Sequence, residues 1–143
     1  MYSEAMMTPA NTYTIQQASA LVDLPCTTLR YYEDMGLIGP IARASSGHRR
    51  YTDSDLGLIN MIKKLRFTGM SVEAMASFVA LYRIGSSTAR QRRETLEAHR
   101  QAVQARVDEL IATLEFIDYK IGLYENEEAE HERKQLHELP AAG

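Results

Sequence analysis

Two short stretches of this chain gather side chains that suit contact with phosphates and base edges. The first stretch, TTLRYY, contributes Thr27, Thr28, Arg30, Tyr31 and Tyr32. The second stretch, ARASSGHRRYT, surrounds a glycine and contributes Arg43, His48, Arg49, Arg50 and Tyr51. Arginine can grip guanine in a bidentate way, while hydroxyl groups typically hold phosphates. Together the two sets predict a nucleic-acid contact.

A simpler interpretation of the first stretch is also open. One of the two tyrosines would pack in the core, and Arg30 would pair with Glu33 or Asp34 as a solvent-exposed ion pair. The arginines of the second stretch favour the nucleic-acid contact, because they add a second phosphate-binding set beside the first. An enzyme is not predicted, since the chain has one cysteine, no glycine-rich phosphate loop and no recognisable Ser-His-Asp arrangement.

The charge of the chain is uneven along its length. Over all 143 residues the net charge is −3, which alone argues mildly against nucleic acid. Residues 1–88 hold 8 Lys and Arg against 7 Asp and Glu, whereas residues 89–143 hold 8 against 12. The positive charge is concentrated in residues 27–66, with 7 basic against 4 acidic side chains. Such a local basic patch can bind phosphate although the whole chain is acidic.

The elements that must position the first stretch are two short helices. Thr14 and Gln17 have the spacing of a capping box, which predicts a helix that ends at Asp23. Pro25 suits the first turn of a second helix, TTLRYYEDM, which Gly36 closes in a left-handed conformation. Two short helices joined by a tight turn predict a helix-turn-helix.

The second stretch reads as a β-hairpin between helices. Residues 41–44 and 48–51 predict two short strands around the turn at 45–47. Two capped apolar patterns follow and predict two further helices, Thr52 to Gly69 and Ser71 to Gly85. The fold class is therefore predicted as mainly α, a winged helix-turn-helix head with a small β-hairpin wing.

One long helix, from about Ala89 to Glu127, is predicted after this head. Its heptad seam runs through Leu96, Arg100, Val103, Val107, Leu110, Leu114, Ile117, Ile121 and Tyr124. Such a helix is about 58 Å long, more than the small head could cover. An apolar stripe on a lone helix needs a partner, and a second copy of the chain is the simplest one.

The chain thus divides into four predicted parts. They are a disordered lead (1–12), the winged helix-turn-helix domain (13–85), a coiled-coil dimerisation helix (86–127), and a short C-terminal segment and tail (128–143). The first eleven residues lack a basic start and an apolar run, and no run approaches eighteen apolar residues. A cytoplasmic protein without membrane contact is expected.

The segments TIQQAS, TLRYYEDMGLI, GHRRYT, IKKLR and TGMS resemble the MerR family of bacterial transcription regulators, from about Tyr13 to Tyr124. The resemblance implies a homodimer held by an antiparallel coiled coil, with two heads on a pseudo-palindromic operator. It also implies that the dimer lies in an overlong promoter spacer, bends and untwists the DNA, and activates or represses transcription by RNA polymerase. A nucleoid-associated location is expected from the same resemblance.

The resemblance also assigns residues. It implies DNA contacts by Arg30, Tyr31 and Tyr32 from the recognition helix, by Arg49 and Tyr51 from the wing, and by Lys63 and Arg66 from the next helix. Arg43, His48 and Arg50 join this set from their charge and location, and Thr14, Thr27 and Thr28 from their hydroxyls near the helix starts. Many members have a serine where this chain has Pro25, which predicts a small shift of the helix start.

Neither a cofactor nor a metal is predicted, and the residues identify no small-molecule effector. Metal-sensing and cluster-binding relatives need several cysteines, whereas this chain has only Cys26. The segments LEAHR and DYKIGLY resemble a short subgroup that includes aldehyde-responsive regulators, some of which use a cysteine in the helix after the wing. That helix has no cysteine here.

Cys26 itself has two interpretations. A thiol in the first turn of a helix can be reactive, which makes Cys26 a candidate redox residue. The alternative is a small residue that fills the turn near DNA. His99, His131 and His137 match no compact metal site.

Two other functions remain open from the residues alone. An architectural DNA-bending protein would share the winged head but lack effector control, and such proteins seldom carry a long dimerisation helix. A coiled-coil protein-interaction module would use its head to bind protein. It would not bind the DNA upstream of its own gene.

Overall fold

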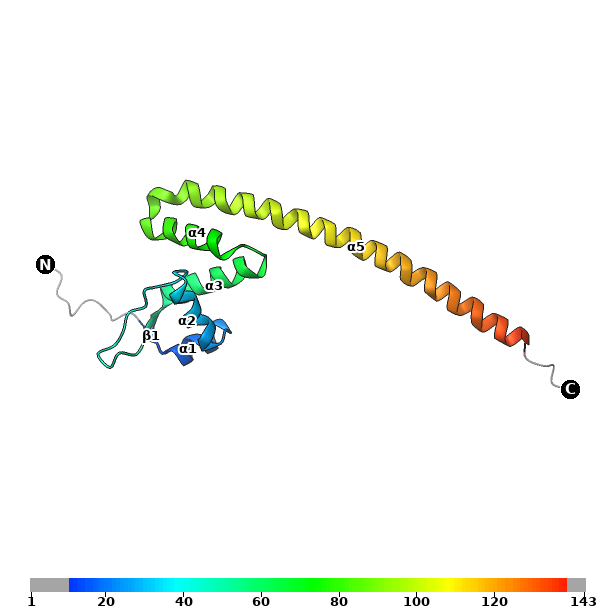
Figure 1. Ribbon diagram of the computed structural model, residues 1–143, viewed down its shortest axis with the longest axis horizontal. Coiled ribbons are helices and arrows are strands. Elements are labelled where there is room, and N and C mark those ends of the chain that lie inside the picture. The colour runs from blue at the N-terminus through cyan, green and yellow to red at the C-terminus, as the bar shows by residue number, and fades with distance from the viewer. Residues whose placement is uncertain (1–10, 139–143) are drawn as a thin grey trace. The chain divides into compact units, whose positions relative to one another are not determined.

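The computed structural model describes residues 11–138. Its elements, in chain order, are β1 (Thr12–Tyr13), α1 (Ile15–Val22), α2 (Cys26–Asp34), β2 (Tyr51–Thr52), α3 (Asp53–Phe67), α4 (Val72–Ile84), the 3-10 turn η2 (Ser86–Thr88) and α5 (Ala89–Glu138) (Figure 1). The fold is mainly helical, as predicted. The chain forms two compact units, one ending at His99 and the other beginning at Arg100.

The predicted helix-turn-helix is confirmed as α1 and α2. The Thr14 hydroxyl accepts a 3.1 Å hydrogen bond from the Gln17 amide, and the Gln17 side chain accepts one of 2.9 Å from the Thr14 amide. This capping box satisfies two amides at the start of α1. After α2, Gly36 adopts a φ of +72°, and the next amide, of Leu37, donates to the Tyr32 carbonyl at 2.9 Å. A side chain at Gly36 would strain this left-handed turn.

The predicted turn at 45–47 forms a hairpin, but its arms make one isolated bridge, Arg43 to Arg49, instead of the two predicted strands, and the hairpin leads into a strand pairing that the sequence does not predict. The Ala44 amide donates to the His48 carbonyl at 2.9 Å, and the Arg50 amide to the Ala42 carbonyl at 2.7 Å. Beyond this hairpin β2 pairs antiparallel with β1, Thr52 facing Thr12 and Tyr51 facing Tyr13. Thr12 is therefore part of a strand, although it was expected in the disordered lead.

Helices α3 and α4 begin at the predicted caps. The Thr52 hydroxyl accepts from the Asp55 amide at 3.1 Å, and the Ser71 hydroxyl accepts from the Ala74 amide at 3.1 Å. The hydrophobic core joins residues of every helix of the first unit. It consists of Ala18, Val22, Leu29, Tyr32, Leu37, Ile38, Ile41, Tyr51, Ile59, Ile62, Leu65, Met70, Met75 and Val79, with Leu96 of α5 packed against it.

The start of α5 belongs to the first unit through specific contacts. Thr88 is 4% exposed, and its hydroxyl lies 2.6 Å from the Leu81 carbonyl and 2.8 Å from the Gly85 carbonyl. Arg92 donates to the same hydroxyl at 3.1 Å. One helical turn beyond Leu96, His99 lies 2.7 Å from the Thr68 hydroxyl at the end of α3. Leu96 and His99 thus extend the head past its predicted end at residue 85.

The second unit is the remainder of α5. The helix continues to Glu138 rather than ending near Glu127. From Val107 onward the apolar and aromatic residues of the predicted seam are exposed, with exposed fractions from 40% for Val107 to 61% for Tyr124, whereas Val103 is half-buried. Leu96, also predicted for the seam, packs instead against the core of its own head.

Parts of the predicted ends lie outside the described residues, namely 1–10 of the lead and 139–143 of the tail. Between residues 11 and 138, no helix has the length and apolar character that crossing a membrane requires.

Replacing Thr88 by valine tests the junction between α4 and α5. Valine keeps the shape but removes the hydroxyl, so the partners of Thr88 lose a buried hydrogen bond, which costs about 1–2 kcal/mol. We expect a lower midpoint of thermal unfolding, followed by circular dichroism. Thr113→Val is the control, because that hydroxyl bonds the Glu109 carbonyl on an exposed helix. Equal effects of the two changes would contradict the role of Thr88.

Candidate nucleic-acid interface

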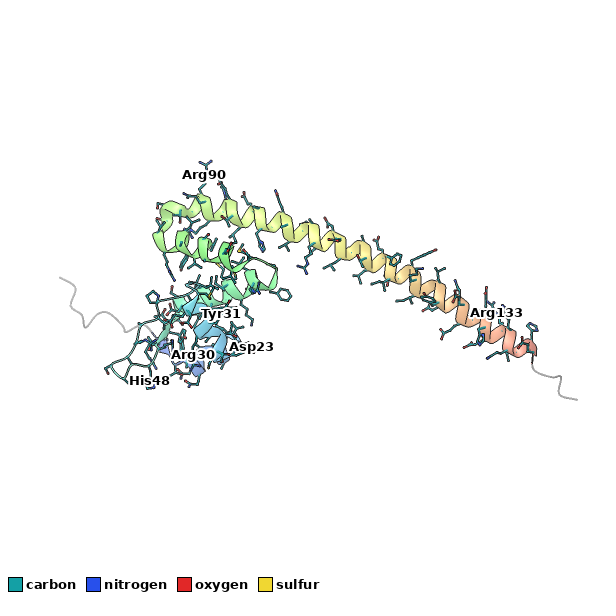
Figure 2. All side chains as sticks on the ribbon, viewed as in Figure 1. Asp23, Arg30, Tyr31, His48, Arg90 and Arg133 are labelled. Atoms are coloured by element: carbon teal, nitrogen blue, oxygen red, sulfur yellow. The ribbon has the colours of Figure 1, made fainter. Side chains whose placement is uncertain are left out.

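Helix α2 presents a polar face formed by the first predicted set. Thr27, Arg30 and Tyr31 are exposed, the Tyr31 residue by 48%, and Thr28 is half-buried. Figure 2 labels Arg30 and Tyr31 on α2 and His48 at the hairpin. Tyr32 is only 6% exposed. One tyrosine of the pair therefore packs in the core, as the simpler interpretation predicted, while the other remains at the surface.

Glu33 connects α2 to the hairpin. Its carboxylate accepts from Arg49 Nε at 2.7 Å and from the Ile41 amide at 2.8 Å. Both side chains of the ion pair are largely buried, with 21% of Arg49 and 15% of Glu33 exposed. The simpler interpretation of the sequence paired Arg30 with Glu33 or Asp34. The bend of the chain after α2 instead brings Arg49 to Glu33.

The surroundings of Glu33 act on its pKa in opposite directions. Burial raises the pKa, whereas the hydrogen bonds from Arg49 and Ile41 and the charges of Arg49 and Arg43 lower it. The lowering effects prevail, so the pKa lies below the ordinary value of 4.5. Correspondingly, the hydrogen bond that Arg49 donates to the Glu33 carboxylate raises the pKa of Arg49. The pair is therefore ionised at neutral pH and holds the hairpin against α2.

The remaining hairpin residues lie at the surface. Arg43 and His48 are exposed, and Arg50 is half-buried. Arg43 Nη1 donates to the Gly47 carbonyl at 2.9 Å, which closes the hairpin turn. Arg50 Nη2 donates to the Thr12 hydroxyl at 2.8 Å and thereby ties β1 to the hairpin.

Tyr32 and Tyr51 do not lie where the resemblance predicted them. Tyr51 has no exposed surface, and its buried hydroxyl has no hydrogen-bond partner. Burial raises the pKa of both phenols. Their rings pack in the core beneath the surface. This burial argues against the direct DNA contacts that the resemblance implied for both tyrosines. The segments R-Y-Y and R-R-Y do not reveal which side chains are buried, because neighbouring residues on a helix or strand point to different sides.

Two basic side chains position the site. Lys63 Nζ, on α3, donates to the carbonyls of Val22 and Asp23 at 2.9 and 3.3 Å. It thus caps the end of α1, which is a structural role beside the predicted contact. Arg83 of α4 donates to the carbonyls of Gly36 and Gly39, in the loop that follows α2. Sequence reasoning missed Arg83, and it missed the contacts of Glu33 with Ile41 and Arg49, because these partners are not neighbours in the chain.

The other predicted residues have simpler surroundings. Arg66 is exposed near the end of α3, and the Thr14 hydroxyl is used as the cap of α1. Cys26 is half-buried, and its thiol lies 3.7 Å from the Ile15 carbonyl. Across the described part of the chain, no group of three or more His, Cys, Asp or Glu converges as a metal site would require.

Lowering the pH tests the ion pair. A carboxylate whose pKa is lowered by folding stabilises the fold above its unfolded pKa, and this stability is lost as the pH falls through the folded pKa. Glu33→Gln removes the charge, and we expect a loss of about 1–2 kcal/mol at pH 7. The variant should also lose less stability than the parent between pH 6 and about pH 3.5. Chemical denaturation at several pH values measures both effects. Equal stability of the two proteins at pH 7, or curves that stay parallel as the pH falls, would contradict the role of the ion pair.

Removing the Tyr51 hydroxyl is expected to leave the protein as stable or more stable. A buried hydroxyl without a partner costs free energy, so Tyr51→Phe should raise the free energy of unfolding by about 1 kcal/mol. DNA affinity should change less than twofold, because the ring lies in the core. Tyr31→Phe is the matched control and should bring no gain in stability. A large loss of DNA affinity in Tyr51→Phe would show that the hydroxyl reaches the ligand.

Comparison with known proteins identifies the family. Residues 13–80 match the MerR HTH family of regulatory proteins, and residues 56–118 match the MerR DNA-binding family. An uncharacterised HTH-type transcriptional regulator of Haemophilus influenzae is 31% identical over 118 residues, which cover 82% of this chain and 87% of that protein. The HTH-type transcriptional regulator AdhR of Bacillus subtilis is 39% identical over 87 residues, covering 61% of this chain and 62% of that protein.

Solved structures agree with this result. HiNmlR, a MerR family regulator lacking the sensor domain and solved bound to promoter DNA, is 31% identical with a TM-score of 0.75. The match covers 83% of this chain and 94% of that one. A chain from Listeria monocytogenes ascribed to the same family is 35% identical, with a TM-score of 0.80 and coverage of 87% and 96%. With these matches and the winged head described above, the chain belongs to the MerR family of helix-turn-helix regulatory proteins.

Proposed function

We propose that this protein is a homodimeric transcription regulator that binds a pseudo-palindromic site in a promoter spacer. It bends and untwists the DNA there and thereby changes how RNA polymerase engages the promoter. It acts in the bacterial cytoplasm, at the nucleoid, and not as an enzyme. The observation that carries this proposal is the exposed polar face of α2, joined to the hairpin by the Glu33–Arg49 ion pair.

The residues proposed to contact DNA are those with exposed or half-buried side chains around this face. They are Thr27, Thr28, Arg30 and Tyr31 on α2, Arg43, His48 and Arg50 on the hairpin, and Arg66 on α3. Arg30 and Tyr31 would meet base edges or phosphates in the major groove, and the hairpin arginines would meet the adjacent backbone. Arg49, Lys63 and Thr14 would act mainly by positioning these elements through the bonds they already make.

The exposed seam of α5 supports the dimer. A helix of 50 residues that exposes a regular apolar stripe to water is not stable on its own. A second copy would cover the stripe and place two heads on two half-sites. HiNmlR, whose structure contains promoter DNA, supports the same use of the head here.

The two other candidate functions differ in their expected DNA binding. An architectural protein would bend DNA without a promoter preference, and a protein-interaction module would not protect its own upstream DNA. A footprint on the promoter next to the gene separates all three. Two-fold symmetric protection supports the proposed regulator.

Arg30→Ala tests the proposed contact face. Each dimer loses two contacts, and we expect at least tenfold weaker binding to the promoter DNA together with a shallower salt dependence. Arg133→Ala is the matched control, because it removes the same charge from an exposed position of α5, labelled in Figure 2. Mobility shifts at several salt concentrations measure both effects. If the two variants bind equally well, the α2 face is not the DNA-binding surface.

A further inference from the structure

Charged residues flank the apolar seam of α5 in an uneven pattern. The two rows of positions beside the seam recur every seven residues, one through 90, 97, 104, 111, 118, 125 and 132, the other through 92, 99, 106, 113, 120, 127 and 134. At the start of the helix these rows carry Arg90 and Arg92, and toward its end they carry Glu125 and Glu127. One end of the helix is therefore basic where the other end is acidic.

The seam itself also carries charges. Arg93, Arg100 and Glu128 occupy seam positions of the same type, seven residues or a multiple of seven apart. In a parallel pair of helices, each would face its own copy across the seam, and like charges would meet at three levels. In an antiparallel pair they face other residues instead. The charges thus disfavour the parallel arrangement.

We propose that the basic first turns of α5 bind the acidic segment 125–128 of a second copy, and that this contact selects one register of the antiparallel dimer. Arg90 pairs with Glu125 of the other copy, and Arg92 with Glu127. In this register, the residue numbers of any two seam residues that face each other across the dimer add up to 217. Each pair occurs twice by the two-fold symmetry. The inference rests on the proposed homodimer and goes beyond it by naming the register and the residues that set it.

The seam supports the same register. At a sum of 217, Val107 meets Leu110 and Val103 meets Leu114, so apolar residues fill the centre. Arg93 meets the ring of Tyr124, an arrangement that permits a cation–π contact. Glu128 meets Ala89, and like charges across the seam are thereby avoided.

A shift by one heptad, to a sum of 224, is less favourable. Arg90 would then meet Glu132, but three repulsive pairs would form, Glu97 with Glu125, Arg106 with Lys120, and Arg92 with Lys134. In the proposed register the flanking rows contain one repulsive pair of carboxylates, Glu97 with Asp118. The two registers therefore differ in charge, while both bury apolar residues.

The residues involved are accessible in the single chain. Arg90 projects from α5 on the side away from α4 (Figure 2), 82% of its side chain is exposed, and its Nε lies 3.0 Å from Glu94. Glu125 and Glu127 are exposed. Arg92 is more constrained, because it bonds Thr88 and lies 5.8 Å above the Tyr82 ring. Arg90 is therefore the better residue for a test.

A charge exchange tests the pair. Arg90→Glu turns attraction into repulsion at two symmetric sites and should weaken the dimer about tenfold at low salt, less at high salt. Adding Glu125→Arg should restore most of this affinity, whereas adding Glu132→Arg should not. Local loss of the Arg90–Glu94 pair cannot explain such a selective recovery. Sedimentation equilibrium of the full chain measures the dissociation constants. If Glu132→Arg restored the affinity of the Arg90→Glu variant and Glu125→Arg did not, the proposed register would be wrong.

A distance measurement tests the register without altering these charges. A spin label at Asn126→Cys, in a Cys26→Ser background, lies on the outer side of the coil. At 1.5 Å per residue, the two labels would be about 52 Å apart along the axis in the proposed register and about 42 Å apart in the shifted one. A distance near 52 Å supports the proposal, and one near 42 Å overturns the register alone. A distance of about 20 Å would indicate parallel helices, and a monomer would overturn the dimer as well.

Discussion

The ion pair between Glu33 and Arg49 is the interaction on which the surface of the head depends. The hairpin of residues 41–51 carries three arginines and no acidic side chain, and α2, against which it is held, carries Arg30. Glu33 places one negative charge between them, and its second hydrogen bond, to Ile41, fixes the loop that joins them. The pair lies largely out of water, where its attraction is less screened. The two parts of the candidate interface are therefore held as one surface.

The sequence predicts those features of the fold that have a local cause. The caps at Thr14, Thr52 and Ser71 and the turn at Gly36 involve residues a few positions apart, so their types and spacing suffice. The pairing of β1 with β2 joins residues 38 and 40 positions apart through strands of two residues each, which are too short to show a periodicity. The same reason hides Arg83, whose partners lie in the loop after α2.

The two predicted stretches are joined in the structure by the Glu33–Arg49 pair, whereas several of their individual side chains differ from expectation. Residue type identified the two stretches, but type alone does not distinguish a tyrosine in the core from one at the surface. Tyr31 and Tyr32 are adjacent and chemically identical, and only the direction of each side chain on α2 separates them. Arg49 shows the same effect, because a charged residue was expected to face outward and instead meets a carboxylate from another element.

The contacts of Thr88, Leu96 and His99 have a consequence for how heads and dimerisation helices can be exchanged between related proteins. The first three turns of α5 are part of the head by their packing, although they are continuous with the exposed helix. A recombination that joins two genes at Gly85 would separate the head from residues on which its packing depends. One that joins them after His99 would carry the whole head. In this protein the smallest segment that carries the complete head therefore ends inside helix α5 rather than in the loop before it.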